Sequence, residues 1–314
     1  MTPIATVTLN PALDLATATA SVAPGRKLRC EAPRTDPGGG GINVSRVIRR
    51  LGGESLALVA LAGATGERLK TALEAEGIIA RYLRAPGETR ESLSVIDRET
   101  GEQYRFVMPG AVWTEAEGEA ALDAVAVACR EGALVVLSGS LPPGLPADLP
   151  ARLARRLVAK RARLILDTSG ATLAAARRPA HPVMVLRMDE IEAEALAQRP
   201  LPNRADTADF AQALVRDGAA EVVIIARGSD GSVLATEAER HFCRAAKMPV
   251  VSKTGAGDSF LAAFTLALAR EADHPEALSA AVAAASAAVM TEATELCSAE
   301  DAIRLIAECP CETV

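Results

Sequence analysis

The sequence predicts an α/β protein with a mostly parallel central sheet between two layers of helices and a small β-sheet lid. From residue 114 onward, short apolar runs alternate with helical patterns. This order indicates a parallel sheet that is covered on both faces. Residues 88–110 instead alternate in steps of two, as a β-hairpin does. Together with about 16–35, they are expected to form the lid. The 314 residues, 49% of them hydrophobic, suffice for one such domain spanning the whole chain.

The first third of the chain is expected to begin the central sheet. An apolar run over 4–9 predicts the first strand, and glycines at 52 and 53 end the first helix near residue 51. Cations and apolar residues alternate over 27–30, which predicts a half-exposed strand. The other elements expected before the hairpin are a strand over 56–61, a helix over 67–76 and a strand over 78–83.

The rest of the chain repeats strand and helix and then changes character. Parallel strands are expected over 133–137, 164–167, 183–186 and 221–225. The helices expected around them cover 115–130, 147–160, 170–177, 190–198 and 206–217. A turn at 228–231 leads into antiparallel strands near 231–245, and three helices over 257–270, 275–291 and 298–307 close the chain.

The composition excludes several classes of partner. A net charge of −6 argues against nucleic acid or an anionic membrane surface, and 3% aromatic residues leave little surface for base stacking. No apolar run is long enough to span a membrane, and no targeting segment is expected ahead of the first strand. The six scattered cysteines contain no Cys-x-x-Cys pair and are interpreted as reduced thiols, so we expect a cytoplasmic protein.

One short stretch, residues 253–260, carries the strongest chemical signal. Two glycines bracket an alanine, an aspartate follows, and a helical pattern starts at once: Gly255, Ala256, Gly257 and Asp258. A glycine turn at a helix N-terminus forms an anion site that suits a phosphoryl group. Asp258 would then take a proton from a hydroxyl while the neighbouring amides hold the phosphoryl group. The alternative is that Asp258 caps the helix.

A second glycine-rich stretch, residues 37–44, precedes the first helix. Its glycines, among them Gly39 and Gly40, would let the backbone approach a ligand closely. We reject a dinucleotide-binding loop, because no clean strand leads directly into the stretch and no ribose-binding acid follows on schedule. Asp14 follows the first strand, where open α/β sheets carry ligand groups, and is a candidate for hydroxyl recognition. A solvated turn aspartate is the alternative.

The predicted lid contains four cationic candidates. Arg90 and Arg105 lie in its hairpin, and two arginines that converge on one point suit a phosphate ester. Two surface arginines on neighbouring strands are the alternative. Lys27 and Arg29 fall in the other lid segment.

Taken together, these motifs resemble the ribokinase-like sugar kinases of the phosphofructokinase B type, and most closely the minor 6-phosphofructokinase branch. The resemblance covers nearly the whole chain and implies a ribokinase-like three-layer α/β/α sandwich. The two glycine motifs are specific to the superfamily, and 27–30 and 103–110 to the phosphofructokinase branch. The stretches that carry the resemblance are 13–14, 27–30, 37–43, 101–110, 138–144 and 255–259.

The resemblance implies ATP-dependent phosphorylation of the C1 hydroxyl of fructose 6-phosphate, with Mg²⁺, to give fructose 1,6-bisphosphate in glycolysis. Asp258 would be the general base, beside an anion hole formed by Gly255, Ala256 and Gly257. Sugar hydroxyls would be held by Asp14, Gly39, Gly40 and Asn43, and the 6-phosphate end by Arg90, Arg105 and Ser140. Lys27 and Arg29 would reach phosphates or a second subunit, since members of the family commonly form homodimers through the lid.

On the nucleotide side the resemblance implies binding by Arg187, Asp189, Gly228, Gly231 and Ser286, with Glu192 at the metal and a further site for K⁺. The sequence departs from the family here. Where the family usually shows Lys-Pro-Asn-x-x-Glu, residues 187–192 keep only the glutamate. An added carboxylate at Asp189 would help bind Mg²⁺ or would repel the nucleotide. Ala226 and Arg227 also replace a small hydroxyl residue before Gly228, and Glu295 stands where close relatives carry a basic residue.

These departures keep other functions open. Within catalysis, the alternative substrates are tagatose 6-phosphate and fructose 1-phosphate, because the position of the phosphate decides which arginines are used. Outside catalysis, the altered residues 187–192 are compatible with a sugar-phosphate-binding protein whose use of nucleotide is impaired.

Overall fold

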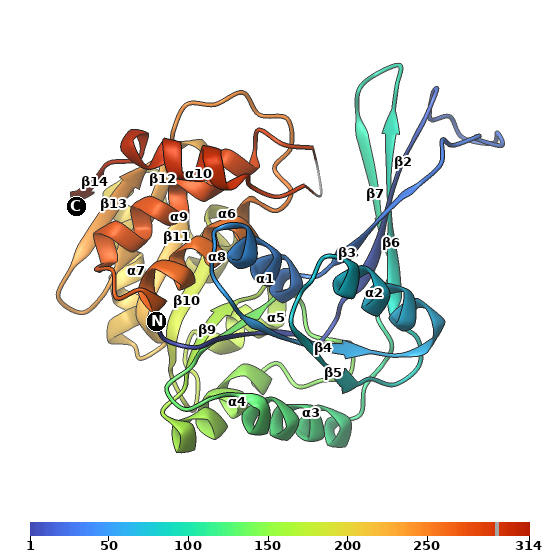
Figure 1. Cartoon of the computed structure of the whole chain (residues 1–314). Coiled ribbons are helices and arrows are strands. Elements are labelled where there is room, and N and C mark those ends of the chain that lie inside the picture. The colour runs from blue at the N-terminus through green and yellow to red at the C-terminus, as the bar shows by residue number, and fades with distance from the viewer. Residues whose placement is uncertain (293–294) are drawn as a thin grey trace.

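The computed structural model describes residues 1–292 and 295–314. Within that part of the chain, the main body is built on a ten-stranded sheet of order β14-β13-β12-β11-β10-β9-β8-β1-β4-β5 (Figure 1). Its strands are β1 (Ile4–Thr8), β4 (Leu56–Leu61), β5 (Ala80–Arg84), β8 (Leu134–Ser138), β9 (Arg163–Asp167), β10 (Val183–Asp189), β11 (Ala220–Ala226), β12 (Gly231–Ala235), β13 (Arg240–Arg244) and β14 (Cys311–Thr313).

In this sheet, the seven neighbouring strands β5, β4, β1, β8, β9, β10 and β11 pair in parallel. The remaining strands, β12, β13 and β14, extend the sheet antiparallel. Central strands such as β8 are buried along their whole length, because helices cover both faces. The predicted α/β class is therefore confirmed. The sequence analysis assigned no strand to 311–313, since three residues carry too little pattern; pairing with β13 forms this strand.

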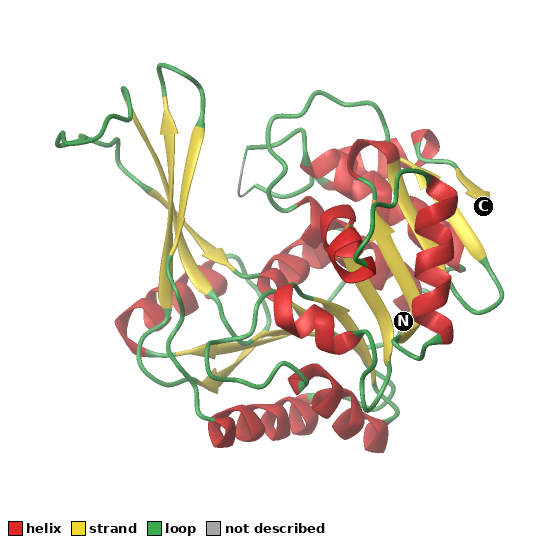
Figure 2. Ribbon diagram, turned by 180° about the vertical axis from the view of Figure 1, so that it is seen from behind, coloured by secondary structure: helices red, strands yellow, loops and turns green. Residues whose placement is uncertain are grey.

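Helices form a layer on each side of the sheet (Figure 2). One layer contains α1 (Gly40–Arg50), α2 (Gly63–Ala75), α8 (Ala256–Ala269), α9 (His274–Ala288) and α10 (Ala299–Leu305). The other contains α3 (Glu115–Ala128), α4 (Leu149–Leu157), α5 (Gly170–Ala176), α6 (Glu190–Ala197) and α7 (Arg204–Arg216). This confirms the three-layer arrangement. In the described residues, every helix is too short or too polar to cross a membrane.

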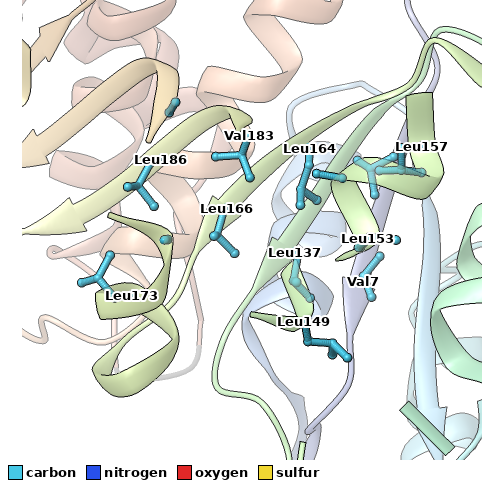
Figure 3. Close-up of a cluster of buried hydrophobic side chains, with 14 of the residues drawn as sticks. Val7, Leu137, Leu149, Leu153, Leu157, Leu164, Leu166, Leu173, Val183 and Leu186 are labelled. Carbon is cyan, nitrogen blue, oxygen red and sulfur yellow. The ribbon is translucent and has the colours of Figure 1, made fainter. Parts of the chain in front are cut away.

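Alternate residues of the central strands supply two separate cores. On β8, Val135 and Leu137 belong to the core under α3 and α4, whereas Leu134 and Val136 belong to the core under α1 and α8. Figure 3 shows part of the first core, where Leu137 lies near Leu149 of α4. Each such side chain stabilises the fold by about 1.5–3 kcal/mol. The sheet is thus a rigid support for the loops at its edges.

A separate four-stranded sheet of order β3-β2-β6-β7 projects from the main body (Figure 1). Its strands are β2 (Ala12–Thr19), β3 (Arg34–Gly38), β6 (Arg90–Asp97) and β7 (Gln103–Val107). The predicted hairpin forms as β6 and β7, which pair antiparallel. We call this sheet the lid.

Two local predictions about the lid are wrong. Asp14 lies inside β2, not in a turn after the first strand, because β2 begins only four residues beyond the end of β1. Residues 27–30 form no strand. Their segment touches β2 through one isolated bridge between Cys30 and Thr19, and Leu28 stays 38% exposed. The alternating pattern there has no neighbouring strand along its length to pair with.

Candidate active site

The N-terminus of α8 places an aspartate beside unpaired backbone amides. Gly255 is the N-cap residue, and its φ of 78° lies in the left-handed region that favours glycine. Asp258 follows in the first turn, but no side chain caps this helix. The carboxylate of Asp258 instead accepts a hydrogen bond from the side chain of Asn43, with 2.9 Å between Nδ2 and Oδ2. The capping alternative for Asp258 is therefore excluded.

A chain of polar side chains on α1 supports this carboxylate. Arg46 donates through Nη1 to Oδ1 of Asn43 at 3.3 Å, which fixes the amide so that its nitrogen faces Asp258. Arg46 is itself buried and donates to both carboxylate oxygens of Glu76, at 2.7 and 2.8 Å. Arg46 was not among the residues predicted from the sequence. The helical spacing of three residues from Asn43 was the available signal.

The electrostatic surroundings of Asp258 suit proton transfer near neutrality. Burial raises the pKa of its carboxyl to about 7, while the hydrogen bond from Asn43 opposes this increase. Asp167 and Asp14 raise the pKa further, and Arg187 lowers it. A carboxyl with such a pKa is both available and basic enough to accept a proton from a hydroxyl.

The glycine-rich stretch brings α1 against the ends of two strands and the lid. Gly39 and Gly40 lie at the start of α1, and Gly40 packs against Ser138 at the end of β8. Gly38 allows the closest approach: a Cβ at this position would lie 2.1 Å from Oδ2 of Asp14. The glycines therefore allow close packing against Asp14 and Ser138.

The lid presents three charged candidates on one face. In the register of its strands, Asp14 lies opposite Ser92, and Arg105 lies opposite Ser94. Because every second residue of a strand shares a face, Asp14, Arg90 and Arg105 all belong to the same face. Burial raises the pKa of Asp14 to about 6, and Arg90 and then Arg105 oppose the increase. Both predicted arginines therefore interact electrostatically with Asp14.

Hydrogen bonds tie this face of the lid to the main body. Arg90 donates to the carbonyl oxygen of Asn10 at 3.1 Å, and the side chain of Asn10 donates to Ser140 at 3.1 Å. Arg105 reaches Oγ1 of Thr254, next to the glycine turn of α8, at 3.5 Å. A cavity of about 40 Å³ lies between the lid and this turn, and Asp14, Arg105 and Thr254 are among its lining residues. Asp14 and Arg105 therefore line one cavity, whereas Arg90 and Ser140 are linked to each other through Asn10.

The predicted nucleotide side lies at the carboxyl ends of neighbouring parallel strands. Arg187 on β10 lies opposite Asp167 on β9 in the strand register, and their side chains form an ion pair at 3.5 Å. A Cβ on Gly257 would lie 3.2 Å from Nη1 of Arg187, so this guanidinium borders the anion site of α8. Asp167 was not among the site residues predicted from the sequence, although a carboxylate directly after an apolar strand was the signal for it.

Asp189 and Glu192 are engaged with each other. They form a capping box at the start of α6, in which each side chain accepts a hydrogen bond at 2.9 Å from the backbone N–H of the other residue. Burial raises the pKa of Glu192, as it does that of Asp167. Asp189 and Glu192 lie close to Arg187 at the end of β10, but their hydrogen bonds to each other serve to begin α6.

The remaining candidates are more scattered. Gly228 lies in the turn after β11, and Gly231 begins β12, where a Cβ would lie 2.0 Å from the carbonyl oxygen of Cys243. Lys27 and Arg29 are exposed in the loop between β2 and β3. Ser286 is buried within α9 and donates to the carbonyl oxygen of Val282 at 2.9 Å. Within the described part of the chain, none of these three polar side chains forms a hydrogen bond with Asp258.

Comparisons with known proteins identify the class to which this fold and site belong. The model of the pfkB family carbohydrate kinases matches residues 7–301, and the chain belongs to this family. The predicted family is therefore confirmed, and the protein is a carbohydrate kinase.

Among curated relatives, the ATP-dependent 6-phosphofructokinase isozyme 2 of Mycobacterium tuberculosis is 40% identical over 96% of this chain and 88% of its own. The isozyme 2 of Escherichia coli is 39% identical over 98% and 99%. Crystal structures of Escherichia coli phosphofructokinase-2 match with TM-scores of 0.93 for a complex with potassium, at 38% identity, and 0.90 for a complex with fructose-6-phosphate, at 37% identity. Each match covers 98% of this chain and 99% of that one.

Proposed function

We propose that the protein transfers the γ-phosphoryl group of ATP to the C1 hydroxyl of fructose 6-phosphate and forms fructose 1,6-bisphosphate. The observation that carries this proposal is the carboxylate of Asp258, which stands in the first turn of α8 without capping it. The relatives named 6-phosphofructokinase, similar over nearly the whole chain, support the choice of substrate.

Asp258 performs the proton transfer in this proposal. Its carboxylate accepts the proton of the C1 hydroxyl as the oxygen attacks phosphorus, and Asn43 keeps one carboxylate oxygen oriented. The backbone amides at the start of α8, with Gly255, Ala256 and Gly257, stabilise the negative charge on the transferred group. Arg187, which borders the same turn, adds a positive charge to this anion hole.

The lid and the glycine-rich stretch bind the sugar phosphate. Asp14, Gly39, Gly40 and Asn43 bind its hydroxyls, and Arg90, Arg105 and Ser140 bind the 6-phosphate. Arg90 is fixed by its hydrogen bonds to main-chain carbonyls, whereas Arg105 is exposed, and within the described residues its one hydrogen bond is a long contact with Thr254. Arg105 is therefore free to move onto a phosphate, and its motion would close the lid over the site.

The predicted nucleotide side suits Mg²⁺ that is bound together with a nucleotide, when phosphate oxygens supply most of the ligands of the metal. In the described residues, no group of three or more metal-binding side chains comes together. Kinases usually hold Mg²⁺ with one or two carboxylates plus phosphate oxygens, and Asp167 and Glu192 are the carboxylates placed to do so. Bound Mg²⁺ would neutralise charge on the phosphates. Arg187, Asp189, Gly228, Gly231 and Ser286 complete the proposed nucleotide side, and K⁺ would bind near it, as potassium is present in the relative's structure.

We also propose a homodimer that forms through the lid. Both outer strands of the lid, β3 and β7, have an unpaired edge within the described sheet. Phe106 and Val107 at one of these edges are 51% and 63% exposed. Pairing with a second copy would cover this edge and the apolar side chains. Lys27 and Arg29, on the exposed loop of the lid, would then contact the second subunit.

A coupled ADP-release assay tests the activity, with fructose 6-phosphate, tagatose 6-phosphate and fructose 1-phosphate offered in turn. We expect the highest kcat/KM with fructose 6-phosphate, a requirement for Mg²⁺, and a large loss of turnover in Asp258→Asn. A higher kcat/KM with another sugar phosphate would reassign the substrate. Tight binding of fructose 6-phosphate without any ADP release by the folded wild type would overturn the kinase proposal in favour of a binding protein.

A further inference from the structure

The C-terminal edge of the main sheet, far from the lid in Figure 1, brings two cysteines directly opposite each other. β14 pairs antiparallel with β13, and the register sets Cys311 across from Cys243. The next pair along the ladder is hydrogen-bonded, because the N–H of Arg244 donates to the carbonyl oxygen of Pro310 at 3.2 Å. Since the two types of pair alternate in an antiparallel ladder, Cys243 and Cys311 form a pair without backbone hydrogen bonds.

This geometry suits a covalent bond between the two sulfurs. In such a pair the Cα atoms lie about 4.5 Å apart, inside the range of about 4.4–6.8 Å that disulfides span. Opposite residues also project from the same face of the sheet. The thiols interact with each other, and this interaction is the largest influence on the pKa of either group.

The two thiols differ in access and in acidity. Cys311 is only half-buried, and its interaction with Cys243 lowers its pKa. Cys243 is fully buried and donates to the carbonyl oxygen of Cys309 at 3.0 Å; its interaction with Cys311 and then burial raise its pKa. Thiolate character and access decide which cysteine meets an oxidant first, and both favour Cys311.

We propose that Cys243 and Cys311 are a cross-strand dithiol that a hydroperoxide oxidises to a disulfide. The Cys311 thiolate attacks a peroxide oxygen, the O–O bond breaks, and the departing hydroxide or alkoxide takes up a proton, which leaves a sulfenic acid and water or an alcohol. The sulfur of Cys243 then attacks the sulfur of Cys311, the S–O bond breaks, and water leaves with the proton of Cys243. Two electrons pass from the sulfurs to one peroxide.

The bond would fasten a short edge strand and constrain the chain around the active site. β14 has three residues, so its pairing alone is weak. The loop closed between Cys243 and Cys311 contains the whole of α8, α9 and α10 and therefore Asp258. A cross-link around a loop of this length restricts the unfolded chain strongly, which raises resistance to unfolding.

The test is oxidation of the reduced full-length protein with one equivalent of hydrogen peroxide, followed by non-reducing proteolysis and mass spectrometry. We expect one cross-linked peptide that joins Cys243 to Cys311 and a mass lower by two hydrogen atoms. We also expect the thermal midpoint to rise on the order of 5 °C, reversibly with dithiothreitol. A cross-link through Cys309, or sulfinic acid at Cys311 without a cross-link, would overturn the proposal.

Two matched variants assign the effect to this pair. Cys311→Ser, at a half-buried position, should fold and should lose both the cross-link and the increase in midpoint. Cys30→Ser, in the exposed loop of the lid, should keep both. If oxidised Cys311→Ser gained the same increase as the wild type, another modification would be responsible and the inference would fail.

Discussion

The acceptor and nucleotide sides of the site use their carboxylates differently. On the acceptor side, Asp258 opens a helix without capping it and is held by Asn43 from another helix. On the nucleotide side, Asp189 and Glu192 satisfy the backbone of their own helix. An acid in the first turn of a helix is ordinarily explained by capping, so the informative case is the one that does not cap. This contrast supports the proposal that Asp258 is the catalytic base.

The strongest test of the contrast is Asp258→Asn. We expect kcat to fall by about 10³-fold or more, because the amide keeps the size of the side chain but accepts no proton. Calorimetry should show that fructose 6-phosphate still binds within a few-fold of the wild type. A variant that retains more than a tenth of wild-type kcat would mean that the proton leaves by another route.

The next effect concerns substrate binding by the lid. Arg105→Ala should raise KM for fructose 6-phosphate by about 10- to 100-fold with kcat nearly unchanged, since it removes a charge-assisted contact to the phosphate end. Arg81→Ala, at an exposed position on β5, is the matched control and should leave KM unaltered. An unchanged KM in Arg105→Ala would return this arginine to the surface-residue alternative.

The fold followed from the sequence more completely than the site did. Continuous apolar strands such as β8 are required wherever helices cover both faces, so their pattern is unambiguous. By contrast, the alternation over 27–30 looks like a strand locally, yet its pairing with β2 is limited to one isolated bridge between Cys30 and Thr19. The support of Asn43 by Arg46 and the pairing of Asp167 with Arg187 depend on contacts between elements, which a pattern within one element does not reveal.

The pH dependence sharpens the role of Asn43. The pKa of Asp258 is about 7 in the free protein, so kcat/KM should fall as the pH decreases through that value. Asn43 donates to the ionised form and lowers this pKa; Asn43→Ala should therefore move the acidic limb upward by about one pH unit. The phosphate of the substrate titrates equally in assays of the wild type and of Asn43→Ala. The test therefore uses only the difference between their two pH profiles. If the acidic limbs of the two profiles coincided, Asn43 would not lower the pKa of Asp258.

Stability should respond to Asp258 in the direction opposite to activity. Its pKa is raised from 3.8 to about 7 by folding, so the folded state binds more protons between these values and loses stability as the pH rises through them. Asp258→Asn removes this penalty. At pH 8 the variant should gain about 2 kcal/mol, after allowance for solvent access to the half-buried side chain. The difference in thermal midpoint between the variant and the wild type should decrease as the pH falls toward about 4. An equal difference at every pH would mean that the variant is stabilised by better packing and not by loss of the charge.

The smallest effect is expected on the nucleotide side, from Asp189→Asn. Asparagine caps helices as well as aspartate does, so unfolding free energy should change by less than about 0.5 kcal/mol. Asp189 raises the pKa of both Asp167 and Glu192, which shows that its charge acts where the triphosphate is expected. Removing that charge should lower KM for ATP by about two- to threefold. If KM for ATP rises while stability is kept, the carboxylate of Asp189 assists binding of the nucleotide and its metal, and this departure from the family is an adaptation of the donor site. The variant Asp189→Ala also breaks the capping box, so comparing it with Asp189→Asn separates the loss of the helix cap from the loss of charge.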